Sequence, residues 1–493
     1  MSFLFWLFLI LIIYTYAGYP VLIWIIGVVS PKPVIKKQVE PTVVVITSAY
    51  NEKDHIEATV RNKFEQDYPK DKLHYVVVSD ASTDGTDEIV KKLQSEYKNL
   101  HFIRQDERAG KTSALNKAYE YCVSRIAYSE RDADPLSTGR PGTDSCRPRE
   151  SGDLAMSSRP QSRDLSTEIP ASAGTTIGDN GDVILIFSDA NSIYKPGAIK
   201  ALIRNFADPT VGYVTGKMVY QTKTDSGVSE GCGAYMAYEN TLRKLETKVG
   251  SVIGVDGGID ACRLELYEDM DAEDLPDFVL PLTVMQKNYR VVYEPEAVIV
   301  EDANETHEEE FSMRVRVALR SIHALMKFKD LSFNVFNNGL VSWQIISHKG
   351  FRYDIGWMQL VVFITNYFLI PAGTLYHVLF TLQLVFYALA VYGYVRSGAA
   401  AVILSPEGAK DPGYLNQVNE YPGSFVVPPE GETPQDDSKR RNDDNGATKY
   451  DIRNTIYSVI RLCYYLCLVN YASMVAGIQW LRGKKLVTWN PRT

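Results

Sequence analysis

The run Val183-Ile184-Leu185-Ile186-Phe187-Ser188-Asp189-Ala190-Asn191 decides the expected fold, because an unbroken apolar stretch ends in two oxygen-bearing side chains. A second run of the same kind, Val76-Val77-Val78-Ser79-Asp80, stands earlier in the chain. Parallel strands buried on both faces read as short continuous hydrophobic runs, and ligands of open α/β sheets collect at the carboxyl ends of such strands. The two runs therefore predict one polar, cation-binding crevice at the edge of a parallel sheet.

Strand patterns alternate with helical patterns between about residues 41 and 330, which predicts a single, mostly parallel α/β domain. The alternation stops between about residues 125 and 180, where Ser, Gly, Pro, Arg and Asp dominate. A segment of this composition buries too little apolar surface to offset its chain entropy. We therefore expect a disordered insertion there.

Several apolar stretches are long enough to cross a membrane. Residues 1–29 contain no charged side chain, and residues 355–396 and 455–481 offer two more helices and one more, respectively. For any one segment, a buried core helix is the alternative. Residues 331–354 mix aromatic, apolar and basic side chains, which predicts interfacial helices. Residues 397–450 are expected to form a disordered polar loop, and residues 482–493 a tail.

The net charge and the position of the basic residues indicate which partners and which side of the membrane to expect. The formal net charge of −8 over 493 residues excludes a dominant basic stripe, so no nucleic-acid partner is expected. Lys32, Lys36 and Lys37 follow the first apolar segment, which places the middle domain on the cytoplasmic side of a multi-pass protein of the cell (inner) membrane. The basic residues 482–485 also favour that side. Four membrane crossings cannot place both residues 32–37 and residues 482–485 on the cytoplasmic side. One C-terminal segment is therefore expected to lie in the interface or to double back.

Three loops carry residue types suited to phosphate and metal chemistry. Asp189 and Asn191 place two oxygen ligands two residues apart, as a hard cation such as Mg²⁺ or Mn²⁺ requires, although an Asx turn also explains them. Asp80 follows its strand in the same way, with turn capping as the alternative. The loop Glu107-Arg108-Ala109-Gly110-Lys111 enters a helix and suits a diphosphate.

These blocks, together with Ser48-Ala49-Tyr50-Asn51-Glu52, resemble the signature blocks of family 2 glycosyltransferases. More narrowly, the chain resembles the membrane-integrated branch that includes poly-N-acetylglucosamine, cellulose and hyaluronan synthases. The resemblance runs from about residue 41 to 325 and excludes both insertions. It implies a GT-A type, Rossmann-like α/β domain with flanking transmembrane helices, a nucleotide-diphosphate sugar donor, Mg²⁺ or Mn²⁺, and inversion at the anomeric carbon.

The resemblance also assigns expected roles to residues. Nucleoside contacts fall to Tyr50, Glu52 and Asp80, the diphosphate contact to Lys111, and the metal element to Asp189 and Asn191. The family's metal element usually ends in Asp, so Asn191 lowers the charge of this site.

Asp277 resembles the family's catalytic base, which takes the proton of the attacking hydroxyl. A helix N-cap is the alternative for this Pro-Asp pair. Arg316 matches the cation of a Gln-x-x-Arg-Trp motif whose Gln and Trp are absent here; it is expected to stabilise the leaving group, or else to be a surface arginine. The glycine-rich residues 254–263 resemble an acceptor-side loop, where glycines let backbone approach a sugar.

The sequence thus predicts a membrane-bound inverting glycosyltransferase that transfers a sugar, from a UDP-sugar as first choice, to a growing polysaccharide or lipid-linked acceptor. One alternative is transfer of a single sugar to a polyprenyl phosphate or another lipid. An alternative of another class is a non-catalytic membrane scaffold that binds a nucleotide sugar. The expected partners are the donor, the glycan or lipid acceptor and the bilayer, and partner subunits are not identified by the sequence.

Overall fold

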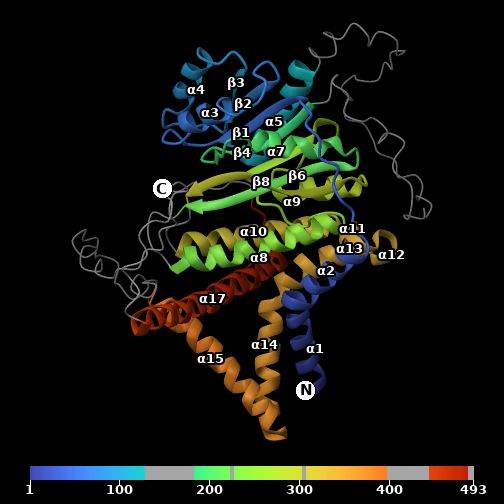
Figure 1. The fold of residues 1–493 in the computed structure, drawn as a ribbon, viewed down its shortest axis with the longest axis vertical. Coiled ribbons are helices and arrows are strands. Elements are labelled where there is room, and N and C mark those ends of the chain that lie inside the picture. The colour runs from blue at the N-terminus through green and yellow to red at the C-terminus, as the bar shows by residue number, and fades with distance from the viewer. Residues whose placement is uncertain (128–182, 222–226, 303–306, 397–443, 487–493) are drawn as a thin grey trace.

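The computed structural model describes residues 1–127, 183–221, 227–302, 307–396 and 444–486. The insertion predicted at about 125–180 and the polar loop predicted at 397–450 lie almost entirely outside the described residues, as does most of the tail 482–493. Within the described residues, an α/β domain lies above a group of long apolar helices (Figure 1).

One eight-stranded sheet forms the middle of the α/β domain, in the order β3-β2-β1-β4-β7-β6-β8-β5. Its strands are β1 (Thr42–Ala49), β2 (Leu73–Ser79), β3 (Leu100–Arg104), β4 (Val183–Asp189), β5 (Ile193–Tyr194), β6 (Val211–Gln221), β7 (Ile259–Arg263) and β8 (Arg290–Asp302). The first four are parallel to one another, as the sequence predicts, but β7 runs antiparallel to both β4 and β6. The sheet is therefore mixed rather than parallel throughout.

Both faces of the sheet are buried, which explains the unbroken apolar runs. Val44 and Ile46 of β1 face a core shared with α5 and α9, whereas Val43 and Val45 face a core shared with α3, α4 and α7. The bounds of these helices are α3 Ile56–Phe64, α4 Thr86–Gln94, α5 Lys111–Tyr121, α7 Ala198–Ile203 and α9 Pro276–Gln286. Short π or 3₁₀ turns follow at η2 (Cys122–Ala127), η4 (Arg204–Ala207) and η5 (Leu264–Leu266).

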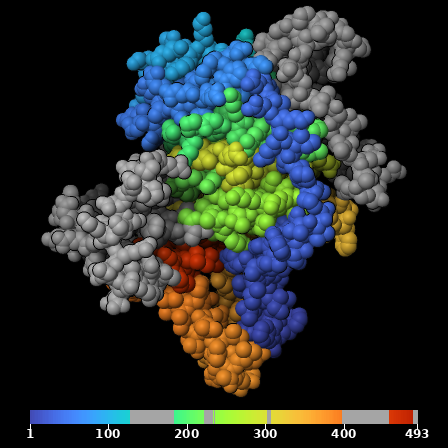
Figure 2. All heavy atoms as spheres, in the orientation of Figure 1, coloured from blue at the N-terminus to red at the C-terminus, as the bar shows by residue number. Residues whose placement is uncertain are grey.

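Two long helices, α8 (Gly227–Val249) and α10 (His307–Lys327), lie beneath the sheet (Figure 1). The other helical segments are α1 (Ser2–Ile13), η1 (Tyr14–Gly18), α2 (Tyr19–Val29), α11 (Lys329–Phe333), α12 (Val335–Asn338), α13 (Leu340–Ile345), η6 (Ile346–Gly350), α14 (Phe351–Leu369), η7 (Ile370–Ala372), α15 (Thr374–Arg396) and α17 (Asp444–Leu481). Of these, α1, α14 and α15 lie below α8 and α10, whereas α11, α12 and α13 lie beside their ends (Figure 1). Figure 2 shows the ends of α1, α14 and α15 projecting from the molecule. Exposed apolar side chains such as Leu382 and Val385 cover this projection.

Among the described residues, four helical stretches are long and apolar enough to cross a membrane: Ser2–Val29, Leu340–Ala372, Thr374–Arg396 and Tyr457–Leu481. The second begins at Leu340, so part of the segment predicted as interfacial is continuous with the apolar helix. The cause is η6, whose π turn links α13 to α14 without a break.

The last helix, α17, runs beside α10 instead of descending with α1, α14 and α15 (Figure 1). Its contacts with α10 advance in step along both helices. The Tyr464 hydroxyl lies 2.8 Å from His307 Nδ1, and the Tyr465 hydroxyl donates to Glu310 at 2.9 Å. Ala472 and Ala476 then pack on Val315, Ala318 and Leu319. Finally, His323 Nε2 lies 3.0 Å from the carbonyl oxygen of Lys484.

Candidate active site

The carboxyl ends of β1, β2 and β4 lie level with one another. In the sheet register, Asp189 is opposite Ser48 on β1, and Ser79 is opposite Ala49 on the other side of the same strand. The two predicted acidic strand ends therefore flank the end of β1. This is the edge of an open α/β sheet where ligands bind.

Asp80 holds the basic loop that precedes α5. Its carboxylate is buried and accepts hydrogen bonds from the backbone amides of Ala109 at 2.7 Å and Gly110 at 2.9 Å. Both donors belong to the neighbouring loop, so these hydrogen bonds join two loops and do not cap a turn within the Asp80 loop. Asp80 fixes this loop so that Lys111, the first residue of α5, points at the end of β4.

Lys111 joins two of the predicted site residues. Its ammonium lies 2.7 Å from Asp189 Oδ1 and 3.5 Å from Asp277 Oδ1. Although burial opposes it, the two carboxylates raise the pKa of Lys111. Burial, with the charge of Asp189 added to it, raises the pKa of Asp277 against the opposing effect of Lys111. A carboxyl group with a raised pKa beside a cation is typical of catalytic acids and bases.

Asp277 lies in the first turn of α9 but does not cap it. The N-cap position is Leu275, and no side chain bonds the first amides of the helix. The carboxyl group instead rests on Gly257, where a Cβ atom would lie 2.5 Å from Asp277 Cγ. Gly257 also has φ = +88°, a conformation that side-chain-bearing residues rarely adopt. A glycine of the predicted acceptor-side loop is therefore needed where the Asp277 carboxyl group sits.

The first two strand-end loops are tied together. The amide of Asn51 donates to Ser82 Oγ at 3.1 Å, the amide of Glu52 to Thr86 Oγ1 at 2.9 Å, and the amide of Thr83 to Asn51 Oδ1 at 2.9 Å. Asn51 itself has φ = +54°, which is uncommon outside glycine and is found at functional sites.

The Tyr50 ring is covered by the Arg108 guanidinium, whose carbon lies 3.9 Å from the ring centroid. This cation–π contact brings the tip of the basic loop over the end of β1. Tyr50 and Glu52 thus lie in the loop beside Asp80, as the predicted nucleoside site requires, and their contact with a nucleoside stays a prediction.

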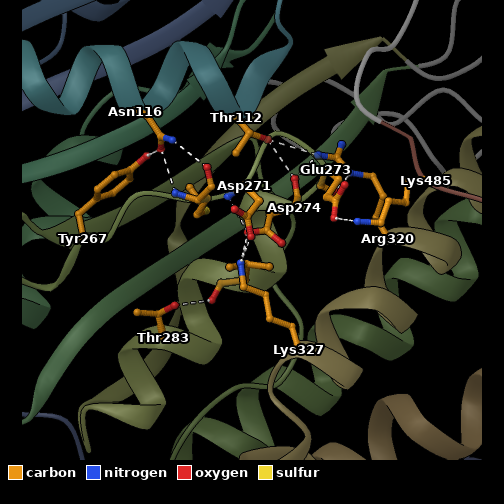
Figure 3. A network of polar contacts seen from close by, with 12 residues as sticks. Thr112, Asn116, Tyr267, Asp271, Glu273, Asp274, Thr283, Arg320, Lys327 and Lys485 are labelled. Carbon is orange, nitrogen blue, oxygen red and sulfur yellow. Dashed lines mark hydrogen bonds and ion pairs between the residues drawn. The ribbon is translucent and has the colours of Figure 1, made fainter. Parts of the chain in front are cut away.

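A polar network anchors the loop that leads to Asp277 (Figure 3). On the α5 side, Asn116 donates to the carbonyl of Met270 at 2.8 Å and accepts from the Tyr267 hydroxyl at 2.8 Å. On the α10 side, Lys327 lies 2.6 Å from Asp274, and Lys485 from beyond α17 lies 2.5 Å from Glu273. The loop is held from three directions, which fixes the start of α9.

Arg320 is the arginine of α10 that reaches this loop. It donates to the carbonyls of Glu273 and Asp274 and, at 3.3 Å, to Thr112 Oγ1 (Figure 3). Arg316 lies one turn earlier on α10, where burial and the charge of Arg320 lower its pKa to about 10. The sequence motif pointed to Arg316 and missed Arg320, although the spacing of four residues places both on one helix face. The role of Arg316 stays a prediction.

A metal ion would be held by few protein atoms. Within the described ranges, no group of three or more His, Cys, Asp or Glu side chains is placed to hold a metal ion. Asp189 Oδ1 bonds Lys111, and Asn191 stands two residues further on. Mg²⁺ commonly binds through one or two carboxylates and substrate phosphates, so this donor set fits a cation completed by the donor's diphosphate.

Sequence reasoning also missed two buried residues. Asp260 of β7 is fully buried, and neither of its carboxylate oxygens has a hydrogen-bond partner within the described residues. Burial, with Asp277 and Asp256 nearby, raises the pKa of Asp260 to about 8. The signal was present, since Asp260 is the only acidic residue of the short strand Ile259–Arg263 and follows an apolar residue.

Lys63 of α3 is the second missed residue. Its buried ammonium donates to the carbonyl of Ser192 and lies 3.7 Å from the Tyr194 ring centroid. It therefore fixes the loop that follows Asp189. No sequence signal marked this residue, because a lysine on an amphipathic helix reads as a surface residue.

Residues 44–128 match the family model described as glycosyl transferase family 2. The chain carries a family 2 glycosyltransferase domain. It is 35% identical over 94 residues (19% of this chain, 36% of the relative) to a Bacillus subtilis (strain 168) glycosyltransferase provisionally assigned to teichuronic acid biosynthesis. It is 29% identical over 111 residues (21% and 26%) to a poly-beta-1,6-N-acetyl-D-glucosamine synthase of Staphylococcus aureus (strain MSSA476).

The chain thus spans about a third of the length of these curated relatives or less. A mannosyltransferase from Pyrobaculum calidifontis, solved in complex with GDP-Man and Mn²⁺, has a similar structure with a TM-score of 0.51 at 20% sequence identity. The match covers 81% of this chain and 99% of that one. The predicted GT-A type fold of the family 2 domain is confirmed.

Proposed function

We propose that this chain is a membrane-bound inverting glycosyltransferase that moves a sugar from a nucleotide-diphosphate sugar to a glycan or lipid-linked acceptor. The observation that carries the proposal is the convergence of Asp189 and Asp277 on Lys111 at the sheet edge of a family 2 domain. The fold it shares with a mannosyltransferase solved with GDP-Man and Mn²⁺ supports a nucleotide-sugar donor and a divalent cation. UDP-sugars remain the first donors to test, with GDP-sugars beside them.

Asp277 is the proposed base. An acceptor hydroxyl oxygen forms the new bond to the anomeric carbon, and its proton passes to Asp277. The bond from that carbon to the diphosphate breaks, and its electron pair leaves with the diphosphate. Lys111 stabilises the charge of the leaving diphosphate. Asp189 and Asn191 would hold Mg²⁺ or Mn²⁺, which supplies further neutralisation of that charge when bound.

The raised pKa of Asp277 supports this role, because a base works best when its pKa approaches the working pH. Asp80 positions the loop of Lys111, and Gly257 positions Asp277. The proposed contact with the leaving group thus comes from the start of α5, and the proposed contact with the acceptor comes from the start of α9.

The test is transfer by purified protein in detergent with Mg²⁺ or Mn²⁺ and a panel of UDP- and GDP-sugars. We expect nucleoside diphosphate release and a glycosylated product. Mass analysis of the product separates the two acceptor hypotheses, since a ladder indicates a growing polysaccharide and one lipid-sugar species indicates a single transfer. Folded protein that neither hydrolyses nor transfers any donor of the panel would refute the proposal.

We also propose that three of the four apolar stretches cross the membrane and that α17 lies along its cytoplasmic surface. Tyr464 and Tyr465 of α17 bond His307 and Glu310 of α10, and Lys484, just beyond α17, bonds His323, so this helix follows the α/β domain rather than the hydrocarbon core. Lys485 beyond α17 is bonded to Glu273 of the catalytic domain. This arrangement places both basic segments, residues 32–37 and 482–485, on one side.

The topology is tested with single cysteines in a background in which the six native cysteines are replaced. A membrane-impermeant maleimide should label Lys484→Cys in inside-out vesicles and Ser2→Cys in right-side-out vesicles. Labelling of both positions from the same side would refute the three-crossing topology.

A further inference from the structure

A cluster of charged side chains lies where α8 meets the start of α14, and it contains neither Lys111 nor Asp189. We call it the α8–α14 charge cluster, and its members are Glu239, Arg243, Glu246, Asp256, His348, Lys349 and Arg352. Most of them are buried. Buried charges are costly unless they are paired, so the pairing within the cluster is informative.

Within the part of the chain that the structure describes, all but one of these groups have partners. Arg352 pairs with Glu239, and Arg243 lies 2.5 Å from Asp256. Although burial opposes its charge, Arg352 and His348 hold the pKa of Glu239 well below its usual range.

His348 bridges two carboxylates. Its Nδ1 lies 2.7 Å from Glu246, and its Nε2 lies 3.2 Å from Glu239. Carboxylate oxygens only accept, so each ring nitrogen that carries a proton can donate to one of them. His348 therefore links Glu246 and Glu239 across the cluster.

Lys349 is the exception. Within the described residues, its ammonium makes no hydrogen bond and no ion pair, although the side chain is only partly exposed. Glu239 and Glu246 are near enough to act on the Lys349 ammonium electrostatically, but each already bonds other side chains, Glu239 with Arg352 and His348 and Glu246 with His348 and Tyr19. The Lys349 ammonium therefore keeps its hydrogen-bond donors for an anion.

The position of Lys349 places this charge beside the acceptor-side loop. The end of its side chain packs on Gly254, where a Cβ atom would lie 2.7 Å from Lys349 Nζ. Gly254 is three residues before Gly257, which supports Asp277, so their Cα atoms are at most about 11 Å apart. A short glycosyl group can bridge from an anion at Lys349 to the proposed base.

The same position lies at the membrane end of the domain. Lys349 belongs to η6, which leads directly into α14, one of the apolar helices. The Tyr19 hydroxyl of α2 donates to Glu246 of the cluster at 2.5 Å. The cluster therefore stands where the apolar helices meet the domain, the level at which lipid headgroups lie.

We propose that Lys349 binds the phosphate of a lipid-linked acceptor, a saccharide joined to a polyprenyl chain through phosphate. This inference rests on the proposed function and names its acceptor class. The phosphate accepts hydrogen bonds from the Lys349 ammonium, the saccharide reaches Asp277, and the hydrocarbon chain extends along the apolar helices. The anion proposed at Lys349 is not the donor's diphosphate, because on the proposed function Lys111 binds that diphosphate at the sheet edge.

The test is direct binding, which needs no turnover. Farnesyl phosphate, farnesol and inorganic phosphate are titrated against the detergent-solubilised full chain, and UDP and GDP binding is measured in parallel. The variants are Lys349→Met, Lys349→Arg, which keeps the charge, and Lys329→Met as a control at an exposed lysine near the same surface. Thermal unfolding of each variant reports whether it is folded.

We expect farnesyl phosphate to bind more tightly than farnesol, and Lys349→Met to weaken its binding about 10- to 100-fold, as loss of a charge-assisted hydrogen bond does. Lys349→Arg and Lys329→Met should retain binding, and nucleotide binding should not change in any variant. If Lys349→Met does not fold, the proposal is still tested by comparing the affinity for farnesyl phosphate with that for farnesol, both on the native chain and on Lys349→Arg.

Equal binding of farnesyl phosphate and farnesol would overturn the proposal, as would an unchanged preference in Lys349→Met. Inorganic phosphate that binds as tightly as farnesyl phosphate would show a soluble-phosphate site and also overturn it. These outcomes are distinct from failure of the proposed function, which would appear as absence of nucleotide binding and of sugar transfer.

Discussion

Replacing Gly257 by Ala should damage catalysis more than folding. The new Cβ atom would lie 2.5 Å from Asp277 Cγ, whereas ordinary contacts begin at 3.4 Å, so the carboxyl group must move by about 1 Å. A misplacement of this size can lower turnover about 100-fold, equivalent to about 2.7 kcal/mol of barrier. The positive φ of +88° adds a folding cost of about 1–2 kcal/mol.

Gly197→Ala is the matched control, because Gly197 has φ = +78° and an added Cβ atom would meet nothing within 4 Å there. Both variants should lose similar stability in denaturant titrations, but only Gly257→Ala should lose turnover of a nucleotide sugar, with donor affinity unchanged. If Gly257→Ala were folded and turned over as fast as Gly197→Ala, then Asp277 would not need its present position, and our assignment of the base would be wrong.

Three further predictions concern charge. Asp277→Asn should lower turnover about 100- to 10,000-fold and leave donor binding unchanged. The acid limb of the wild-type pH–rate profile should lie above the usual Asp pKa of 3.8, because the pKa of Asp277 is raised, and the variant should lack this limb. Undiminished turnover of the variant would contradict the prediction. Asp260 has a folded-state pKa of about 8 against 3.8 unfolded, so the folded state binds its proton more tightly and stability falls as pH rises through this interval. Asp260→Asn should therefore gain stability over wild type at pH 8 relative to pH 5 in thermal unfolding, and an equal difference at both pH values would count against it. Arg108→Ala removes the cation–π contact with Tyr50 and should weaken UDP binding about 2- to 30-fold in calorimetry, whereas an unchanged Kd would place the nucleoside elsewhere.

The positions of Asp80 and Asp189 at one sheet edge were predictable because each follows a buried strand, and parallel strands end at the same edge. Lys111 was predicted to contact the diphosphate, but its position between Asp189 and Asp277 was not predicted. Asp277 was found through resemblance, but its support by Gly257 was not predictable, since it depends on how α9 packs against the loop before β7. Arg320 was missed because the motif resemblance pointed to Arg316, one turn earlier on the same helix face, whose role stays a prediction.

The sequence by itself determined the elements: which runs are buried strands, which stretches are apolar enough for a bilayer, and which polar residues end the strands. Hydrophobic periodicity carries this information within each element. Only the tertiary structure decided that β7 runs antiparallel, that α17 follows α10, and that Lys349 packs on Gly254 and forms no ion pair within the described residues. These features arise between elements far apart in the chain, where packing and the pairing of buried charges select one arrangement, and no local pattern records that choice.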